Sequence, residues 1–217
     1  MTIVRDGDDY LYPCIAAVAP YVKKVQIILD SRSSDNTQEV LETLKHNFDN
    51  VEYSIYPVTD PARDLVEMRN KFFPFEEKWG FIVDSDEYHY GAKGYEFWDS
   101  RPSYAFLCYA IWSREKIHKS SSRPTIGRVF RNSPGLKWSG PFGNERLYDY
   151  GVPVFDGAVL LPHRYIHFTH IKKEGWREEM KKKRVADSKY LSKTPEEIIN
   201  IVDKIHEAMP DVRFREV

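Results

Sequence analysis

Few cysteines, no long apolar run and almost no net charge mark this 217-residue sequence. Two cysteines, Cys14 and Cys108, cannot form a disulfide framework, and their apolar neighbours predict buried thiols in a reducing compartment. No uncharged apolar run is as long as the roughly 18 residues that a helix needs to span a bilayer. The opening residues MTIVRDGDDY carry charge early and do not resemble a secretory signal. We therefore expect a cytoplasmic protein without a transmembrane segment.

The charges nearly cancel, with 32 Lys plus Arg against 33 Asp plus Glu, so the whole chain does not favour nucleic acid as a partner. The distribution is uneven, because the segment 163–193 holds ten basic and four acidic residues. Its basic run, Lys181–Arg184, is compatible with contact to a diphosphate, with peripheral contact to an anionic membrane surface, or with a solvated helix face. Trp176 and Met180 give this predicted helix an apolar side, which favours the solvated face.

Short β-rich runs alternate with helix-like stretches in the first part of the chain. The runs lie at 2–4, 24–29, 51–56 and 80–83, and the helix-like stretches at about 8–19, 36–47 and 61–75. This alternation predicts a half-Rossmann parallel sheet with crossover helices, an α/β fold. Later strand-like segments separated by Pro, Gly and Asn predict a mixed sheet, followed by helices at 174–193 and 194–209. No repeat or linker divides the chain, which favours one domain.

Acidic residues follow two of the apolar runs. Asp30 ends one of them, and Asp84, Asp86 and Glu87 follow another. Ligands of open parallel sheets bind outside the carboxyl ends of the strands. Crowded carboxylates repel one another and lose hydration, a cost that a divalent cation relieves, and such a cation would bridge a diphosphate. The alternative is a plain acidic turn in which Asp84 caps the following residues.

Five segments in order resemble the family-2 inverting glycosyltransferases of the GT-A fold, which transfer a sugar from a nucleoside diphosphate sugar. The segments are TIVRDGDDYLYPCI, VQIILDSRSSDNT, MRNKFFPFEEKWGFIVDSDE, RVFRNSPGLKWSGPFGNERL and YIHFTHIKKEGWREEMKKKR. The resemblance implies a single GT-A domain over 1–217, with a half-Rossmann parallel sheet extended by a mixed sheet and flanked by helices. Residues 1–87 would bind the nucleotide sugar, 88–170 the acceptor, and 171–217 would form the C-terminal helices.

Several residues of this chain stand at the motif positions that form the donor site in the family. The resemblance implies that Asp30, Arg69, Asp84 and Ser85 bind the donor, with UDP as the preferred nucleotide. It implies Mn²⁺ or Mg²⁺ as the cofactor, held by Asp84 and Asp86, with Asp86 as the direct ligand. The metal would stabilise the diphosphate as leaving group.

The resemblance also implies Glu145 as the general base that deprotonates a hydroxyl of a glycan or other acceptor, in a hexosyltransferase-type reaction. The alternative is a surface glutamate beside Arg146. Trp138 would pack against a sugar or fill the core. Arg69 would orient Asp84 or approach phosphate, or else pair with Glu67 on the helix surface.

Three histidines crowd one stretch of eight residues: His163, His167 and His170. Alternation along a strand puts His163 and His167 on one face and His170 on the other. Imidazole can complete a metal site begun by carboxylates, so His167 and His170 are candidate further ligands, with ordinary hydrogen bonding as the alternative.

The sequence departs from the family pattern at Arg32 and Asn36, where the family often has glycine, and at Asn144, where it often has histidine. Two other functions stay open on the sequence. One is a non-catalytic nucleotide-sugar or glycan-binding module of the same fold. The other is a nucleotidyltransferase, which the lack of a Gly-rich phosphate loop followed by Lys near the first strand disfavours.

Overall fold

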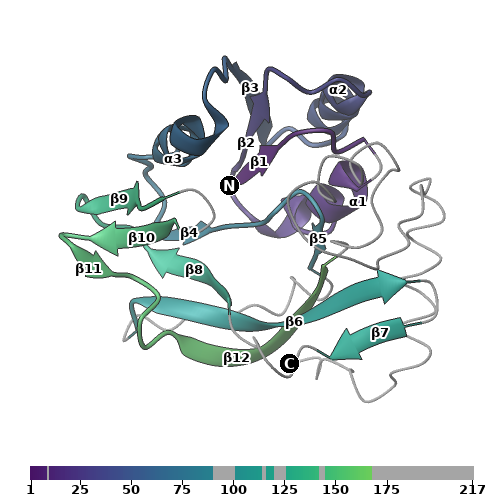
Figure 1. The fold of residues 1–217 in the computed structure, drawn as a ribbon. Helices are drawn as coiled ribbons and strands as arrows, with labels where there is room; N and C mark the ends of the chain where they lie inside the picture. Colours follow the sequence, from purple (N-terminus) through teal and green to yellow (C-terminus); the bar gives the residue numbers. More distant parts are fainter. Residues whose placement is uncertain (9, 90–100, 114–115, 120–125, 142–144, 168–217) are drawn as a thin grey trace.

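The computed structural model describes residues 1–8, 10–89, 101–113, 116–119, 126–141 and 145–167 (Figure 1). The helices are α1 (Leu11–Ala16), the 3-10 turn η1 (Ala19–Tyr21), α2 (Thr37–Asn47) and α3 (Pro61–Asn70). The strands are β1 (Thr2–Val4), β2 (Val25–Asp30), β3 (Val51–Tyr56), β4 (Trp79–Phe81), β5 (Glu87–Tyr88), β6 (Ser103–Ser113), β7 (Lys116–Lys119), β8 (Ile126–Arg131), β9 (Leu136–Ser139), β10 (Arg146–Asp149), β11 (Val152–Pro153) and β12 (Val159–His167). Together they form an α/β fold with a parallel sheet, a mixed sheet and an antiparallel meander.

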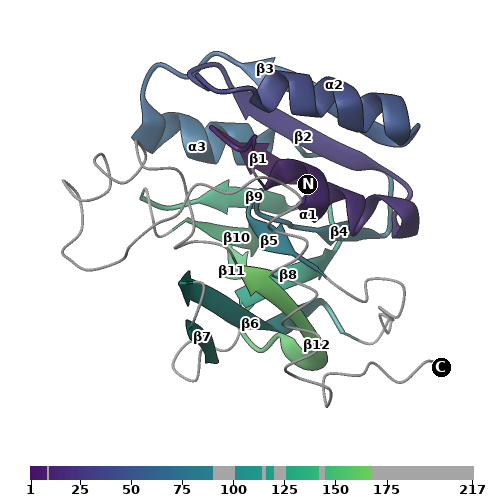
Figure 2. The same ribbon diagram turned by 90° about the vertical axis from the view of Figure 1, so that its right-hand side faces the viewer.

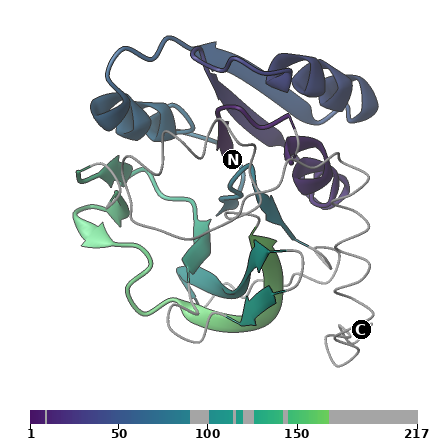
Figure 3. The ribbon, with the colours of Figure 1, turned by 45° about the vertical axis from the view of Figure 1, so that its right-hand side comes forward.

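The parallel sheet has the order β1-β2-β3, with Val4 beside Leu29 and Leu29 beside Ile55. The central strand β2 is buried except at Gln26, as expected for a parallel strand covered on both faces. Leu11, Ile15, Leu41 and Leu44 bring α1 and α2 onto one face, and Met68 and Phe72, in and just after α3, pack with Ile28. Figure 3 shows the strands of this sheet between α3 and the other two helices.

The segment 81–83 joins the parallel sheet to the mixed sheet. The backbone nitrogen of Met1 donates to the carbonyl oxygen of Phe81 at 2.8 Å, and that of Val83 donates to the carbonyl oxygen of Met1 at 3.1 Å. On its other side, the nitrogen of Ile82 donates to the carbonyl oxygen of Arg128 at 2.8 Å. This alternating pattern places 81–83 beside β1, so the residues that follow Val83 leave the sheet at its carboxyl edge.

The mixed sheet has the order β4-β8-β6-β12-β5, with β7 also paired to β6. Its strands are antiparallel except for β6 and β12, which run parallel. Buried aromatic residues fill its core, among them Tyr104, Phe106 and Tyr165. The meander β9-β10-β11 lies against α3, and Figure 2 shows the parallel sheet and its helices stacked above these later strands.

Strands predicted at 2–4, 24–29 and 51–56 are confirmed as β1, β2 and β3. The helix-like stretch 36–47 is confirmed as α2, in which Leu41 and Leu44 are fully buried. The helix starts after Asn36, whose side chain makes no capping bond, and the carboxylate of Asp35 instead accepts from the nitrogen of Thr37 at 3.0 Å.

Two predicted helices are shorter in the structure. The stretch 8–19 contains α1 and then passes into η1, because Pro20 lacks the N–H that an α-helix would need there. The stretch 61–75 ends as a helix at Asn70, shortly before Pro74, whose ring disfavours the helical conformation of Phe73.

The strand-like segment 152–161 contains β11 and the start of β12, and the described part of the segment 165–170 is the end of the same β12, which is irregular between Leu160 and Arg164. Cys14 is buried, as predicted. The predicted helices 174–193 and 194–209 and the side chain of Cys108 lie outside the described residues. No helix in the described ranges has both the length and the apolar character that a membrane span requires.

Candidate functional site

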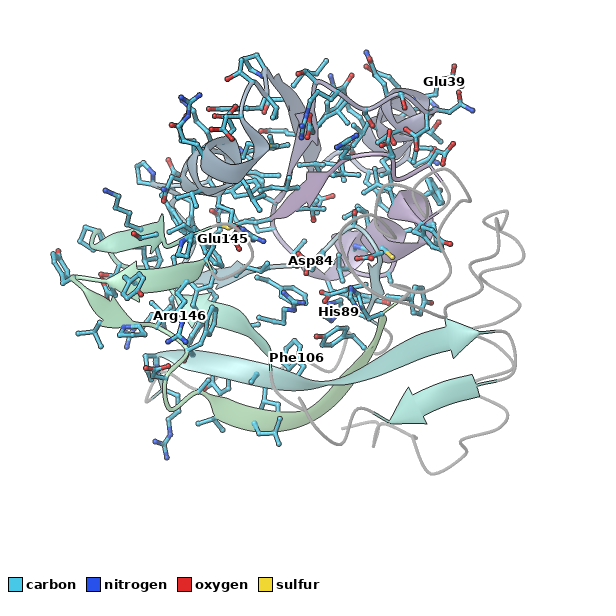
Figure 4. The ribbon with its side chains drawn as sticks, viewed as in Figure 1. Glu39, Asp84, His89, Phe106, Glu145 and Arg146 are labelled. Carbon is cyan, nitrogen blue, oxygen red and sulfur yellow. The ribbon has the colours of Figure 1, made fainter. Side chains whose placement is uncertain are left out.

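Acidic residues gather at the carboxyl edge of the parallel sheet. Asp6 follows β1, Asp30 ends β2, and Asp84 and Asp86 follow the segment 81–83 beside β1. Figure 4 labels Asp84 between the parallel sheet and the mixed sheet. This is the edge where open α/β sheets bind ligands, so it is the candidate site.

The loop after β1 is fixed by the turn after β2. The backbone nitrogen of Asp6 donates to Ser33 Oγ at 2.8 Å, and Asp6 Oδ1 accepts from the nitrogen of Ser34 at 2.8 Å. The nitrogen of Gly7 donates to Thr37 Oγ1 at 2.7 Å. These bonds hold two strand ends in one fixed arrangement, which is what a binding site at this edge requires.

Asp30 is buried and forms a bidentate ion pair with Arg32. Its Oδ1 accepts from the backbone nitrogen of Arg32 at 2.9 Å and from Arg32 Nε at 3.0 Å, while Oδ2 contacts Nη2. Burial alone would raise the pKa of Asp30, but the bonds and charge of Arg32 outweigh it and lower that pKa. Arg32 therefore pairs with the carboxylate that, by the resemblance, would contact the nucleotide.

Asp84 is held by a cation that comes from the mixed sheet. Arg128 in β8 is only 5% exposed, and its Nη2 donates to Asp84 Oδ2 at 3.0 Å and to Glu87 Oε1. The backbone nitrogen of Asp84 donates to Glu87 Oε2 at 3.2 Å, and that of Glu87 donates to the carbonyl oxygen of Asp84 at 3.0 Å. One buried ion pair thus fixes both the side chain and the backbone of Asp84.

Aromatic rings enclose this ion pair. The Arg128 guanidinium lies 5.4 Å from the ring centre of Tyr165, and the His89 ring stacks on Tyr165 with 4.8 Å between ring centres. His89 Nε2 is 3.6 Å from Glu87 Oε2, and Phe81 meets His89 edge-on. Burial lowers the pKa of His89 despite the nearby Glu87, so the imidazole is neutral at pH 7.

Arg69 turns inward from α3 instead of pairing with Glu67. Its guanidinium lies over the Trp138 ring, 4.5 Å from the ring centre. Asn70 fixes the same strand, because its Nδ2 donates to the carbonyl oxygen of Trp138 at 3.1 Å and its Oδ1 accepts from the Trp138 nitrogen at 2.8 Å. Trp138 is buried in the core, so it fills the core and supports Arg69.

The charges around Asp84 keep its carboxyl ionised. Its side chain is 39% exposed, which leaves part of the carboxylate open to a ligand. Burial alone would raise the pKa of Asp84, but the positive charges of Arg128 and then Arg69 outweigh burial and lower that pKa. The Asp84 carboxylate is therefore ionised, with Arg128 in direct contact and Arg69 acting on it through its charge.

Asp86 pairs with His167 at the end of β12. The register of β5 and β12 sets His167 opposite Glu87, and His167 Nε2 lies 3.3 Å from Asp86 Oδ1. Burial would lower the pKa of His167, but the charge of Asp86 and a hydrogen bond to it raise that pKa above the ordinary value. The structure thus brings together two of the predicted metal ligands from distant parts of the chain.

The donor atoms at this point also suit a cation. Two ligands of one octahedral ion with bonds of about 2.1 Å lie about 3 Å apart, close to the separation of Asp86 Oδ1 and His167 Nε2. Asp84, by contrast, is already paired with Arg128. Within the described residues, no three His, Cys, Asp or Glu side chains are grouped as a complete metal site. Any ion here would need further ligands.

The other predicted site residues are spread over the structure. Ser85 lies half-buried in the turn between Asp84 and Asp86. Glu145 lies half-buried immediately before β10, and Figure 4 labels it with its neighbour Arg146, which is exposed. His170, Asn144 and the basic run at 181–184 lie outside the described residues, as does the side chain of His163.

Sequence reasoning missed Arg128 and did not assign a role to Glu87 or His89. A signal for Arg128 exists in the segment IGRVFR, because alternation places the arginine on the same strand face as Phe130. An arginine at an inward position of a strand needs a buried carboxylate, and the spare acidic residue in DSDE, Glu87, supplies it.

Comparisons with known proteins place this chain in no family. No protein-family model and no curated protein matches it. Solved structures that resemble it in part include two of S. aureus TarS 1-349. The complex with UDP has 18% identity and a TM-score of 0.39, and covers 51% of this chain and 35% of that chain. The other has 18% identity and a TM-score of 0.44, and covers 60% of this chain and 45% of that one.

The chain therefore spans less than half the length of either TarS chain. An overlap of this extent establishes neither a shared family nor a shared activity.

Proposed function

We propose that this chain binds a nucleoside diphosphate sugar and transfers the sugar, with inversion, to a hydroxyl of a glycan or another acceptor, as a glycosyltransferase of the GT-A type. The observation that carries the proposal is the Asp84 and Asp86 pair at the carboxyl edge of the parallel sheet, with Arg128 and Arg69 as the main cations acting on Asp84. A diphosphate sugar offers hydroxyls for the carboxylates and anionic oxygens for the guanidinium groups.

A buried donor supports an anionic ligand. The Nε atom of Arg69 is buried and has no hydrogen-bond partner among the residues that the structure describes. Buried donors are satisfied in nearly all native structures, so a ligand oxygen is a natural partner. A phosphate oxygen suits a guanidinium best, because the hydrogen bond is charge-assisted.

The nucleotide would lie along the ends of β1 and β2, where Asp6, Asp30 and Arg32 are fixed by hydrogen bonds. We propose UDP as the nucleotide on the sequence resemblance. Because Arg32 already pairs with Asp30, this chain would present both an acidic and a basic group to the nucleotide.

We propose that Asp86 and His167 hold Mn²⁺ or Mg²⁺, with Asp84 near the ion and His170 as a further candidate ligand. Carboxylate oxygen suits both ions, and imidazole is a common partner ligand for transition metals. When bound, the ion would supply Lewis-acid neutralisation of the departing diphosphate. Arg69 and Arg128 would add fixed positive charge beside the same leaving group.

Glu145 is the proposed general base. The acceptor oxygen would form a bond to the anomeric carbon as the bond from that carbon to the diphosphate oxygen breaks. The acceptor proton would pass to the Glu145 carboxylate, and the nucleoside diphosphate would leave with the bonding electrons. A single displacement of this kind inverts the anomeric configuration.

Thermal unfolding with a panel of nucleoside diphosphates and nucleotide sugars, with Mn²⁺, Mg²⁺ or EDTA, tests donor binding. A ligand at 100 times its Kd stabilises the folded state by about 2.7 kcal/mol. For a chain of this length that corresponds to a rise in Tm of roughly 5–10 °C. We expect this rise with UDP and a divalent cation, and no rise with any nucleotide would contradict the proposal.

Transfer is tested with Glu145→Gln, with the exposed α2 residue Glu39 changed to Gln as a matched control. Loss of a general base lowers the rate of transfer or of donor hydrolysis by about 10²–10⁴-fold. Glu145→Gln should keep the Tm rise with UDP, and Glu39→Gln should keep both properties. A wild type that binds UDP but neither hydrolyses nor transfers from any nucleotide sugar would favour the non-catalytic binding module.

A further inference from the structure

Arg128 is a cation buried in the core of the mixed sheet. It precedes the fully buried Val129 and Phe130 in β8, its guanidinium lies over the ring of Tyr165, and its side chain is only 6% exposed. A buried charge needs partners, and within the described residues Arg128 pairs with two carboxylates: Asp84, which reaches the candidate site, and Glu87, which is fully buried. The guanidinium thus connects the core to Asp84, the partly exposed one of its two carboxylate partners.

Glu87 acts on the same turn through the backbone. Its Oε2 accepts from the backbone nitrogen of Asp84 at 3.2 Å, and its own nitrogen donates to the carbonyl oxygen of Asp84 at 3.0 Å. Arg128 therefore fixes the Asp84 side chain while Glu87 fixes its backbone. His89, which stacks on Tyr165 and has its Nε2 3.6 Å from the same Glu87 Oε2, limits how this pair can move.

We infer that Arg128 and Glu87 are a positioning pair, whose role is to hold the Asp84 carboxylate in the orientation that binds the donor. The inference rests on the proposed function, adds Glu87 to it and assigns Arg128 a positioning role. A buried ion pair gives little net stability compared with apolar side chains of similar volume, so stability alone does not explain it. The bond from Arg128 Nη2 to the partly exposed Asp84 side chain gives the pair a role at the candidate site.

The test separates positioning from stability with the double variant Arg128→Met/Glu87→Leu. Apolar replacement of both charges should fold with a Tm close to that of the wild type. Isothermal titration with UDP and Mn²⁺ should then show a Kd at least tenfold weaker, because Asp84 has lost both constraints. Arg131→Met, the same change on the same strand at an exposed position, should leave the Kd unchanged.

If the double variant does not fold, the Kd of Arg128→Lys for UDP provides the test. Lysine keeps the charge but lacks the planar guanidinium that lies over the Tyr165 ring and fixes the direction in which Nη2 donates to both carboxylates. The Kd of this variant for UDP should therefore also weaken, by a smaller factor. A folded double variant, or a folded Arg128→Lys protein, with the wild-type Kd would overturn the positioning role alone. A wild type that does not bind UDP would overturn the proposed function and the positioning role together.

Discussion

Removing the positive charge of Arg128 alone should destabilise the fold more than removing both charges of its ion pair with Glu87. Arg128→Met leaves Glu87, which has no solvent exposure, without its cation. Breaking a buried pair in this way costs about 3–5 kcal/mol. Because a native domain is stable by only about 5–15 kcal/mol, the loss is a large share of the total.

Glu87→Leu should cost less, since Arg128 keeps its second contact, with Asp84 Oδ2 at 3.0 Å. The double variant should recover most of the loss, because two apolar side chains fill the space without a buried charge. Urea unfolding at pH 7 measures all three. A loss of about 4 kcal/mol lowers the urea midpoint by roughly 1.5–2 M at an m-value of about 2–2.5 kcal/mol/M.

Lys24→Met is the control, because Lys24 pairs with Glu52 at 2.9 Å on the surface. A surface pair contributes about 0–1 kcal/mol, so this variant should unfold close to the wild-type midpoint. If Arg128→Met costs no more than Lys24→Met, Glu87 is not a buried charge that depends on Arg128. If the double variant loses the sum of the two single losses, the two residues are not coupled. Either result would refute the reasoning.

Three further predictions concern other parts of the structure. Burial lowers the pKa of His89 below 6.5, so as the pH falls below that value the unfolded chain gains a proton at His89 and the folded chain does not, and the free energy of unfolding should decrease. In urea unfolding, His89→Phe should make this decrease smaller, and pH profiles that run parallel for the variant and the wild type would contradict the prediction. A Cβ on Gly80 would lie 2.3 Å from a ring atom of Phe130, so Gly80→Ala should cost about 1–3 kcal/mol in the same assay, and an unchanged midpoint would be inconsistent with this packing. Arg32→Ala should raise the pKa of Asp30, measured by carboxyl NMR titration, and an unchanged pKa would rule out the ion pair as its cause.

Local features of the site were predictable. The apolar runs before Asp30 and Asp84 indicate strands, so the acidic residues that directly follow these runs are expected at the strand ends. The prediction that carboxylates meet at one sheet edge needs only the rule that parallel strands share their carboxyl ends. The sequence did not show that Arg32 is the partner of Asp30. Arg32 stands where the resemblance suggests glycine, and a bidentate ion pair between residues two positions apart depends on the conformation of the turn.

The ends of the helices were predicted less well than the strands. Proline decided two of them. The predicted stretch 8–19 stops just before Pro20, but α1 already ends at Ala16, and the predicted stretch 61–75 includes Pro74, but α3 ends at Asn70. Irregular pairing of β12 with β6 between Leu160 and Arg164 likewise has no marker in the spacing of apolar residues.

The sequence by itself determined which residue types stand at the ends of the parallel strands, since a strand and the residue after it are set by local pattern. Only the tertiary structure decided their partners. Arg128 meets Asp84 across 44 positions of sequence, and His167 reaches Asp86 through the register of β12 with β5. Strand order and register depend on packing of the whole core, so the cations that give the carboxylates their character cannot be read from spacing along the chain.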